Sequence, residues 1–267
     1  MYTRNDIIDG LRALGAPRDS VVIMHSSMKA VGEVEGGAEA LLDTLIEYFT
    51  AEGGLFVVPT HTWDNLGTDK PTLDMNIPES NLGLLTRLAA ADPRGVRSKN
   101  PTHSVVVFGD RVRAMALISG DEVADTPTSP DTVYAKLYEM GGYVLLVGVA
   151  QNRNTYLHTV DEMLGVPHRM TDKRVKTTVK LDTGAVIERN LRFFDDEYHP
   201  DISLRFPKYE TAFRYHRAIK DGFVGDAPTQ LCDAVVMKNV VELIHSRSSG
   251  VDPLADEEPI TQAWYVR

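Results

Sequence analysis

Cysteine is almost absent from this sequence of 267 residues. The single cysteine, Cys232, cannot form a disulfide within the chain, and no cluster of thiolates can bind a metal ion. Its neighbours fit the apolar pattern of a helix, so we expect Cys232 to be a core residue and not a nucleophile. Small secreted domains held together by disulfides are therefore excluded, as are thiolate zinc proteins.

Long apolar runs are also missing. None approaches the roughly 18 residues that a membrane helix needs. The first residues, MYTRNDIIDGLRALG, contain no apolar segment typical of a signal peptide. We therefore expect a protein of the reducing cytoplasm that has no membrane partner.

Basic residues are outnumbered by acidic ones. The chain has 28 Lys and Arg residues against 38 Asp and Glu residues, which gives a net charge of −10. This balance repels nucleic acids and anionic membranes, and it attracts cations. A cationic small molecule is the partner that the charge favours.

Several catalytic and binding motifs are missing as well. A strand followed by GxGxxG and the phosphate-binding GxxxxGK[ST] are both absent, so a dinucleotide-binding fold or a P-loop gains no support. No GxSxG is present, which argues against a serine hydrolase. HExxH is absent and the eight histidines are not at ligand spacing, so we expect no metal site.

The first half of the chain alternates predicted strands and helices. A strand over 21–24, a helix that begins at Gly36-Gly37 and a second strand over 55–58 form a strand–helix–strand unit, which favours parallel pairing. Apolar periodicity predicts the remaining elements. These are helices over 3–14, 80–91, 111–118 and 134–140, strands over 104–108 and 143–149, and a loop over 64–78.

The pattern changes after Pro167. Two alternating segments joined by Asp182-Thr183-Gly184 predict a β-hairpin over 175–193. Two more helices are predicted over 206–219 and 229–245. We expect one α/β domain over 1–267, with a mixed, largely parallel central sheet flanked by helices. A hairpin sub-lobe over 168–205 and the C-terminal helices would pack on it.

The segment from Asn154 to Glu162 contains the side chains best suited to acid–base catalysis. If a helix begins near Asn154, His158 shares a face with Asp161 and Glu162. A carboxylate beside an imidazole fixes its tautomer and raises its basicity, and a pKa near 7 suits a general base. The alternative is a surface histidine with an incidental ion pair.

Polar groups also lie at the ends of two predicted strands. His25-Ser26-Ser27 follows the first strand, Gly36-Gly37 opens the next helix, and Thr102-His103-Ser104 leads into the third strand. Hydroxyl and free backbone N–H groups at such places bind phosphate or amide oxygens. An ordinary polar turn followed by a helix cap is the alternative.

The order of five sequence blocks resembles the aminoglycoside 3-N-acetyltransferase family. The blocks are VVIMHSSMKAVGEVEGGAEALLDTL, GLFVVPTHT, RSKNPTHSVVVFG, DTVYAKLYEMGGYVLLVGVAQNRNTYLHTVDE and GFVGDAPTQL. The resemblance covers about 8–243. It implies transfer of acetyl from acetyl-CoA to an amine, classically the 3-amino group of a 2-deoxystreptamine antibiotic. Dimers are common in such families.

The resemblance also implies roles for individual residues. His158 would be the catalytic base, with Asp161 in the place of the usual glutamate and Glu162 as a rival for orienting the ring. Asn152 stands where an aspartate is common. The residues implied to border acetyl-CoA are His25, Ser26, Ser27, Met28, Thr60 and Ser104, and those implied near the amine are Asn100, Thr132 and Glu210.

Three functions stay open at this point. The first is acetyl transfer to an aminoglycoside, with no covalent enzyme intermediate because CoA thiolate is a good leaving group. The second is the same chemistry on another small amine or amino sugar, which the substitutions at Asn100 and Asn152 favour. The third is a protein that binds CoA without turnover.

Overall fold

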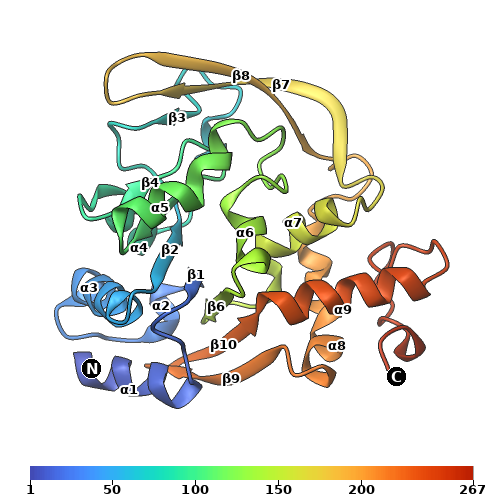
Figure 1. Ribbon diagram of the computed structural model, residues 1–267, viewed down its shortest axis with the longest axis horizontal. Helices are drawn as coiled ribbons and strands as arrows, with labels where there is room; N and C mark the ends of the chain where they lie inside the picture. The colour runs from blue at the N-terminus through green and yellow to red at the C-terminus, as the bar shows by residue number, and fades with distance from the viewer. Residues whose placement is uncertain (267) are drawn as a thin grey trace.

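A seven-stranded mixed sheet forms the centre of the computed structural model, which describes residues 1–266 (Figure 1). Its strand order is β4-β5-β2-β1-β6-β10-β9. The middle strands β2, β1 and β6 pair in parallel, and the outer pairs are antiparallel. The bounds are β1 (Val21–Ser26), β2 (Leu55–Pro59), β4 (Val96–Arg97), β5 (Val105–Phe108), β6 (Tyr143–Val147), β9 (Ile219–Val224) and β10 (Ala227–Asp233). The predicted mixed α/β class is confirmed.

Helices cover both faces of this sheet. Along β1, Val22 and Met24 face one helical layer, and Val21 and Ile23 face the other. Because both faces are buried, the strand is a continuous apolar run without alternation. The first layer contains α1 (Arg4–Leu14), α3 (Gly37–Thr50) and α4 (Leu84–Ala91). The second contains α5 (Arg111–Ile118), α6 (Val133–Glu139), α7 (Tyr156–Met163), α8 (Glu210–Tyr215) and α9 (Ala234–Arg247).

The predicted hairpin is present, and its first strand is longer than expected. β7 (Met170–Lys180) and β8 (Val186–Phe194) pair antiparallel and run along the top of the molecule in Figure 1. They form a separate three-stranded sheet with β3 (Leu73–Asp74), which lies inside the segment predicted as a loop. The hairpin therefore does not extend the central sheet.

The prediction of one helix over 229–245 is wrong. Its first part is strand β10, which pairs antiparallel with β6 and buries Leu231 on one face of the sheet and Cys232 on the other. The helix α9 begins only after Asp233, whose side chain accepts a hydrogen bond from the Val236 backbone N–H. An apolar run of this kind fits helix and strand equally well, and the N-cap aspartate was the available signal. Cys232 is a buried strand residue, and burial raises its pKa to about 12.

The helix predicted over 206–219 is also wrong in part. The segment folds as a 3-10 helix, η4 (Ile202–Tyr209), followed by α8, and its last residue already belongs to β9. Gly225, with a φ of 60°, makes the tight turn between β9 and β10. The predicted helix over 80–91 begins later, at Leu84. The short elements are α2 (Met28–Val31), η1 (Trp63–Asn65), η2 (Ser119–Glu122), η3 (Gln151–Arg153) and η5 (Gln262–Trp264).

Within the described part of the chain, no helix combines the length and the apolar character needed to cross a bilayer.

Candidate active site

Four histidine side chains come together at one edge of the central sheet. His25 lies near the end of β1, His61 follows β2, His103 precedes β5, and His158 lies in α7 after β6. The carboxyl ends of parallel strands meet at the same edge, which is where ligands bind in open α/β sheets. The rings of His61 and His103 are 4.3 Å apart. His25, His103 and His158 all lower the pKa of His61, after burial, which has the largest effect.

Three of these histidines are buried and neutral near pH 7. The His61 Nε2 atom lies 2.9 Å from the Tyr134 hydroxyl, and His103 Nδ1 lies 3.0 Å from the Thr102 hydroxyl. The His25 Nε2 atom is buried with no hydrogen-bond partner among the described residues. Burial lowers the pKa of His25 to about 4 and that of His103 to about 3. Within residues 1–266, no three His, Cys, Asp or Glu side chains are arranged to hold a metal ion.

His158 is held by aromatic packing. Its ring centroid lies 4.3 Å from that of Phe194 and 4.8 Å from that of Phe206. Burial, reinforced by the charges of His103 and Arg169, lowers the pKa of His158 to about 3. Burial thus moves the pKa of His158 away from the value near 7 that suits a general base, because desolvation disfavours the charged imidazolium. The ring is therefore unprotonated at physiological pH, with a nitrogen lone pair free to act as a weak base.

Neither carboxylate expected to orient His158 does so here. Asp161 accepts a hydrogen bond of 2.6 Å from the buried Arg169 guanidinium. The two oxygens of Glu162 accept hydrogen bonds from the hydroxyls of Thr126 and Thr128. A charged guanidinium outcompetes a neutral imidazole for a buried carboxylate. Helical spacing alone could not reveal this competitor, which belongs to a different element.

Thr60 and Ser104, expected to border the cofactor, are fully buried. The Ser104 hydroxyl donates to the Thr60 carbonyl at 2.8 Å, and the two hydroxyls are 3.0 Å apart. Arg97, which sequence reasoning missed, donates to the carbonyls of Thr60 and Glu79. Burial lowers the pKa of Arg97 to about 10. These residues fix the strand-end loops and leave no exposed hydroxyl for a direct cofactor contact.

Asn100 and Thr132 also have structural roles. The Asn100 side-chain oxygen accepts from the backbone N–H of His103 at 2.9 Å, and its nitrogen donates to the Pro127 carbonyl at 2.7 Å. The Thr132 hydroxyl donates to the Ser129 carbonyl at 2.7 Å. Asn100 is 1% exposed and Thr132 is 0% exposed. The predicted direct contact with an amine substrate does not fit this burial.

Asn152 and Glu210 lie apart from the His158 ring contacts. Asn152 is a half-buried residue of η3, just before α7, and no hydrogen bond in the described structure joins it to His158. The Glu210 carboxylate accepts from Arg214 at 2.7 Å and from the Gln230 amide at 3.0 Å. Its negative charge is therefore already paired with a guanidinium.

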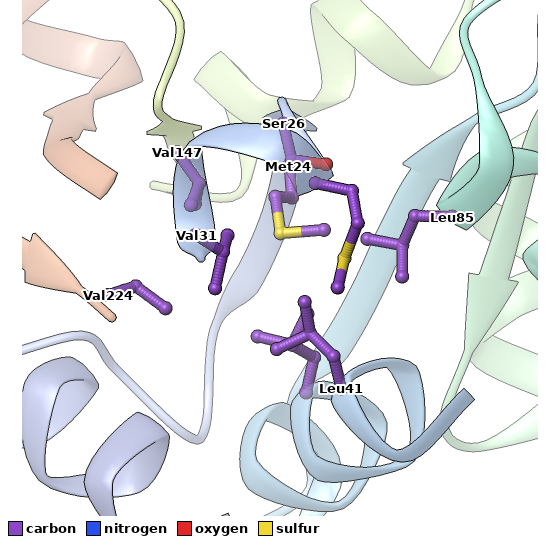
Figure 2. Close-up of a pocket in the computed structure, with 9 residues that line it drawn as sticks. Met24, Ser26, Val31, Leu41, Leu85, Val147 and Val224 are labelled. Carbon is purple, nitrogen blue, oxygen red and sulfur yellow. The ribbon is translucent and has the colours of Figure 1, made fainter. Parts of the chain in front are cut away.

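The predicted cofactor segment around Ser26 divides between the two faces of the sheet. Successive strand residues point to opposite faces, so His25 faces the histidine cluster while Ser26 faces α3. Ser26 and Met28 line a small apolar pocket (Figure 2). The other residues that line it are Met24, Val31, Leu41, Leu45, Leu85, Val147 and Val224. A ligand that touches both His25 and Ser26 must therefore pass over the end of β1.

Asp121 is a buried acid that sequence reasoning missed. Its side chain is 0% exposed, and one oxygen accepts from the backbone N–H of Val133 at 2.9 Å. The other oxygen has no hydrogen-bond partner in the described structure. Burial raises the pKa of Asp121 to about 6, so its charge is unfavourable above that pH.

Replacing Asp121 with asparagine is expected to stabilise the protein at pH 8. Because burial raises the folded pKa of Asp121 to about 6, ionisation costs up to about 3 kcal/mol well above pH 6 and very little at pH 3, where both states are largely protonated. We expect the free energy of unfolding, measured by urea denaturation, to rise by about 1–3 kcal/mol at pH 8. The gain should shrink at pH 5. The exposed neighbour change Glu122→Gln is the control, and a loss of stability at pH 8 would contradict this account.

The sequence of the chain is similar to a known protein family and to individual members of it. A sequence model described as aminoglycoside 3-N-acetyltransferase matches residues 23–244. Aminoglycoside N(3)-acetyltransferase IX of Micromonospora chalcea is 30% identical over 213 residues, which are 73% of each chain.

Solved structures share the fold. A mutant of aminoglycoside acetyltransferase AAC(3)-IVa in complex with a gentamicin matches with a TM-score of 0.76 and 24% identity, covering 93% of this chain and 90% of that one. AAC-IIIb bound to CoASH matches with a TM-score of 0.75 and 23% identity, covering 92% and 97%.

Proposed function

Because the chain belongs to the aminoglycoside 3-N-acetyltransferase family, we propose that it transfers acetyl from acetyl-CoA to the 3-amino group of a 2-deoxystreptamine aminoglycoside. In this proposal His158 is the general base and no covalent enzyme intermediate forms. The observation that carries it is a neutral imidazole beside three further histidines at the carboxyl edge of the central strands. That edge is where the two reactants would meet.

A weakly basic imidazole suits one particular step. The acceptor ammonium first loses a proton to solvent, because it has no lone pair. The free amine then attacks the thioester carbonyl, and the nitrogen of the resulting tetrahedral adduct still carries one proton more than the amide product. That proton is far more acidic than one on a free alkylammonium, because the adjacent carbon bears electron-withdrawing oxygen and sulfur. Neutral His158 would take this proton while CoA thiolate departs, and such general-base help is worth about 10²–10⁴-fold.

Features near α2 and α3 support acetyl-CoA as the acyl donor. The N-terminus of α3 has Gly36 at its cap, with no side-chain cap hydrogen bond. The space next to the α-carbon of Gly37 is open, so an anion can approach the helix N-terminus closely. The side chain of Ser27 makes no cap hydrogen bond to α2, so its hydroxyl is available to a developing oxyanion. The pocket lined by Ser26 and Met28 also has Leu41 and Leu45 of α3 in its wall.

The overall charge supports a cationic acceptor. A net charge of −10 attracts an aminoglycoside, which carries several ammonium groups, and salt screens this attraction. A gentamicin is the ligand of the similar AAC(3)-IVa complex. Other small amines and amino sugars remain the second candidate, because Asn100 and Asn152 differ from the residues usual in the family.

A panel of amines with acetyl-CoA tests the proposal through thiol release. We expect thiol release with gentamicin and kanamycin, little with simple alkylamines, and weaker transfer at high salt. Release only with simple amines or amino sugars would favour the second candidate. Binding of CoA by calorimetry without release from any amine would contradict the proposed enzyme and indicate a binding protein.

A further inference from the structure

Among the described residues, no polar group makes a hydrogen bond that would set the orientation of the His158 ring. No hydrogen bond to either ring nitrogen occurs in the described structure, and Asp161 and Glu162 are engaged elsewhere. A catalytic imidazole usually has one nitrogen held by a carboxylate or a carbonyl, which fixes the tautomer and the plane of the ring. Here the ring contacts are two phenylalanines, so packing must set that plane.

The two phenylalanines come from different layers. Phe206 is fully buried in η4 and belongs to the main core. Phe194 is half-buried and ends β8, in the separate hairpin sheet. Its ring lies between two histidines, 4.3 Å from that of His158 and 5.6 Å from that of His103. Phe194 is thus the one group among the described residues whose ring connects the hairpin with both histidines.

A buried arginine joins the end of β8 to the helix that carries His158. The Arg169 Nε atom donates to Asp161, one turn along α7, and its two terminal nitrogens donate to both Asp252 oxygens at 2.8 Å. The Arg169 backbone carbonyl accepts from the N–H of Asp195, the residue after Phe194. Bidentate pairing of this kind has a strict geometry. The contacts therefore form a closed ring from α7 through Arg169 to Phe194 and back to His158.

We propose that Phe194 is a positioning residue that packs over the His158 ring, sets its orientation and excludes water from it during acyl transfer. The expected effect on kcat rests on the proposed function. The expected effect on the ionisation of His158 does not, because it can be measured without substrate. A misplacement of about 1 Å in a catalytic group can cost about 100-fold in rate. Loss of the aromatic contact should therefore lower kcat and leave binding of acetyl-CoA almost unchanged.

The ionisation of His158 provides an independent readout. The charged and titratable groups around His158 come from three places. His103 and His61 lie in the strand-end loops, Arg169 directly precedes β7, and Asp161 lies on the same helix as His158. Replacing Phe194 removes none of these groups, although His103 also loses an aromatic contact. A smaller side chain admits water, which favours imidazolium, so the pKa of His158 should rise toward its ordinary value.

The test compares Phe194→Leu, Phe194→Tyr and the control Phe223→Leu, which alters an exposed phenylalanine on the far edge strand β9. In Phe194→Leu we expect kcat to fall about 10-fold, with the KM for acetyl-CoA within about 2-fold. In the wild type the His158 ring signals, followed by NMR and assigned with His158→Asn, should stay constant from pH 8 to pH 5.5, and in Phe194→Leu they should begin to titrate within this range. Phe194→Tyr should restore both properties, and the control should match the wild type.

Every result of this test either supports or overturns the positioning role of Phe194. Wild-type kcat and titration in Phe194→Leu would overturn the proposal, as would an equal change in Phe223→Leu. A shifted titration in a protein that acetylates no amine would support the packing role and refute the proposed function instead. If Phe194→Leu does not fold, as judged by circular dichroism, Phe194→Met provides the same comparison.

Discussion

Replacing His158 with alanine is expected to lower acetyl transfer at least ~100-fold, with little change in the affinity for CoA. His158 is the proposed base, and its ring packs against Phe194 and Phe206. The predicted cofactor residues Ser26 and Met28 lie on other elements, so removing the imidazole should leave CoA binding in place. Turnover should be measured by thiol release and CoA affinity by calorimetry. Because removal of a base affects the chemical step, kcat and kcat/KM should fall together.

The matched control changes a histidine outside the cluster. His168 is exposed and has a φ of 58°. Asparagine also tolerates this left-handed conformation, so His168→Asn should not strain the backbone. It should keep wild-type turnover. Near-normal turnover in His158→Ala would remove His158 as the base. The wild-type profile of kcat/KM should also lack an inflection near pH 6.5 from His158, because its pKa is lowered to about 3.

Acidification from pH 7.5 to pH 5.5 is expected to destabilise the fold by about 4 kcal/mol. The folded pKa values of all four clustered histidines lie below the unfolded value of 6.5. The unfolded state therefore binds more protons below pH 6.5, and stability is complete above that pH and is lost as pH falls. Each proton contributes about 1.4 kcal/mol per pH unit, and the raised pKa of Asp121 offsets a small part.

Urea denaturation at the two pH values measures this effect. Against a typical total stability of about 5–15 kcal/mol, the midpoint urea concentration should drop by at least about a quarter. His25→Asn should reduce by about one the number of protons taken up on unfolding below pH 6.5, since His25 is buried without a partner for Nε2 in the described structure. Equal midpoints at pH 7.5 and pH 5.5 would show that the cluster is not buried and neutral.

Local patterns predicted most of the strands and helices that position the site. The apolar runs of β1, β2 and β6 and the period of α3 are visible in the sequence, because burial selects side chains along each element. The hairpin over 175–193 was predicted from alternation and its turn residues. The strands β9 and β10 were not, because their apolar residues fit either a helix or a strand until a neighbouring strand selects one.

The order and spacing of residues along the chain were enough to predict the fold class and the family. The resemblance to that family, and not the spacing around His158, made this histidine the candidate base. The groups that surround this histidine could not be predicted in the same way, because they come from distant segments. His61 and His103 reach the cluster from the strand-end loops, and Arg169 takes the carboxylate of Asp161. Phe194 covers the ring from the hairpin. Burial and competition for partners set the chemistry of a site, and both arise only when segments far apart in sequence pack together.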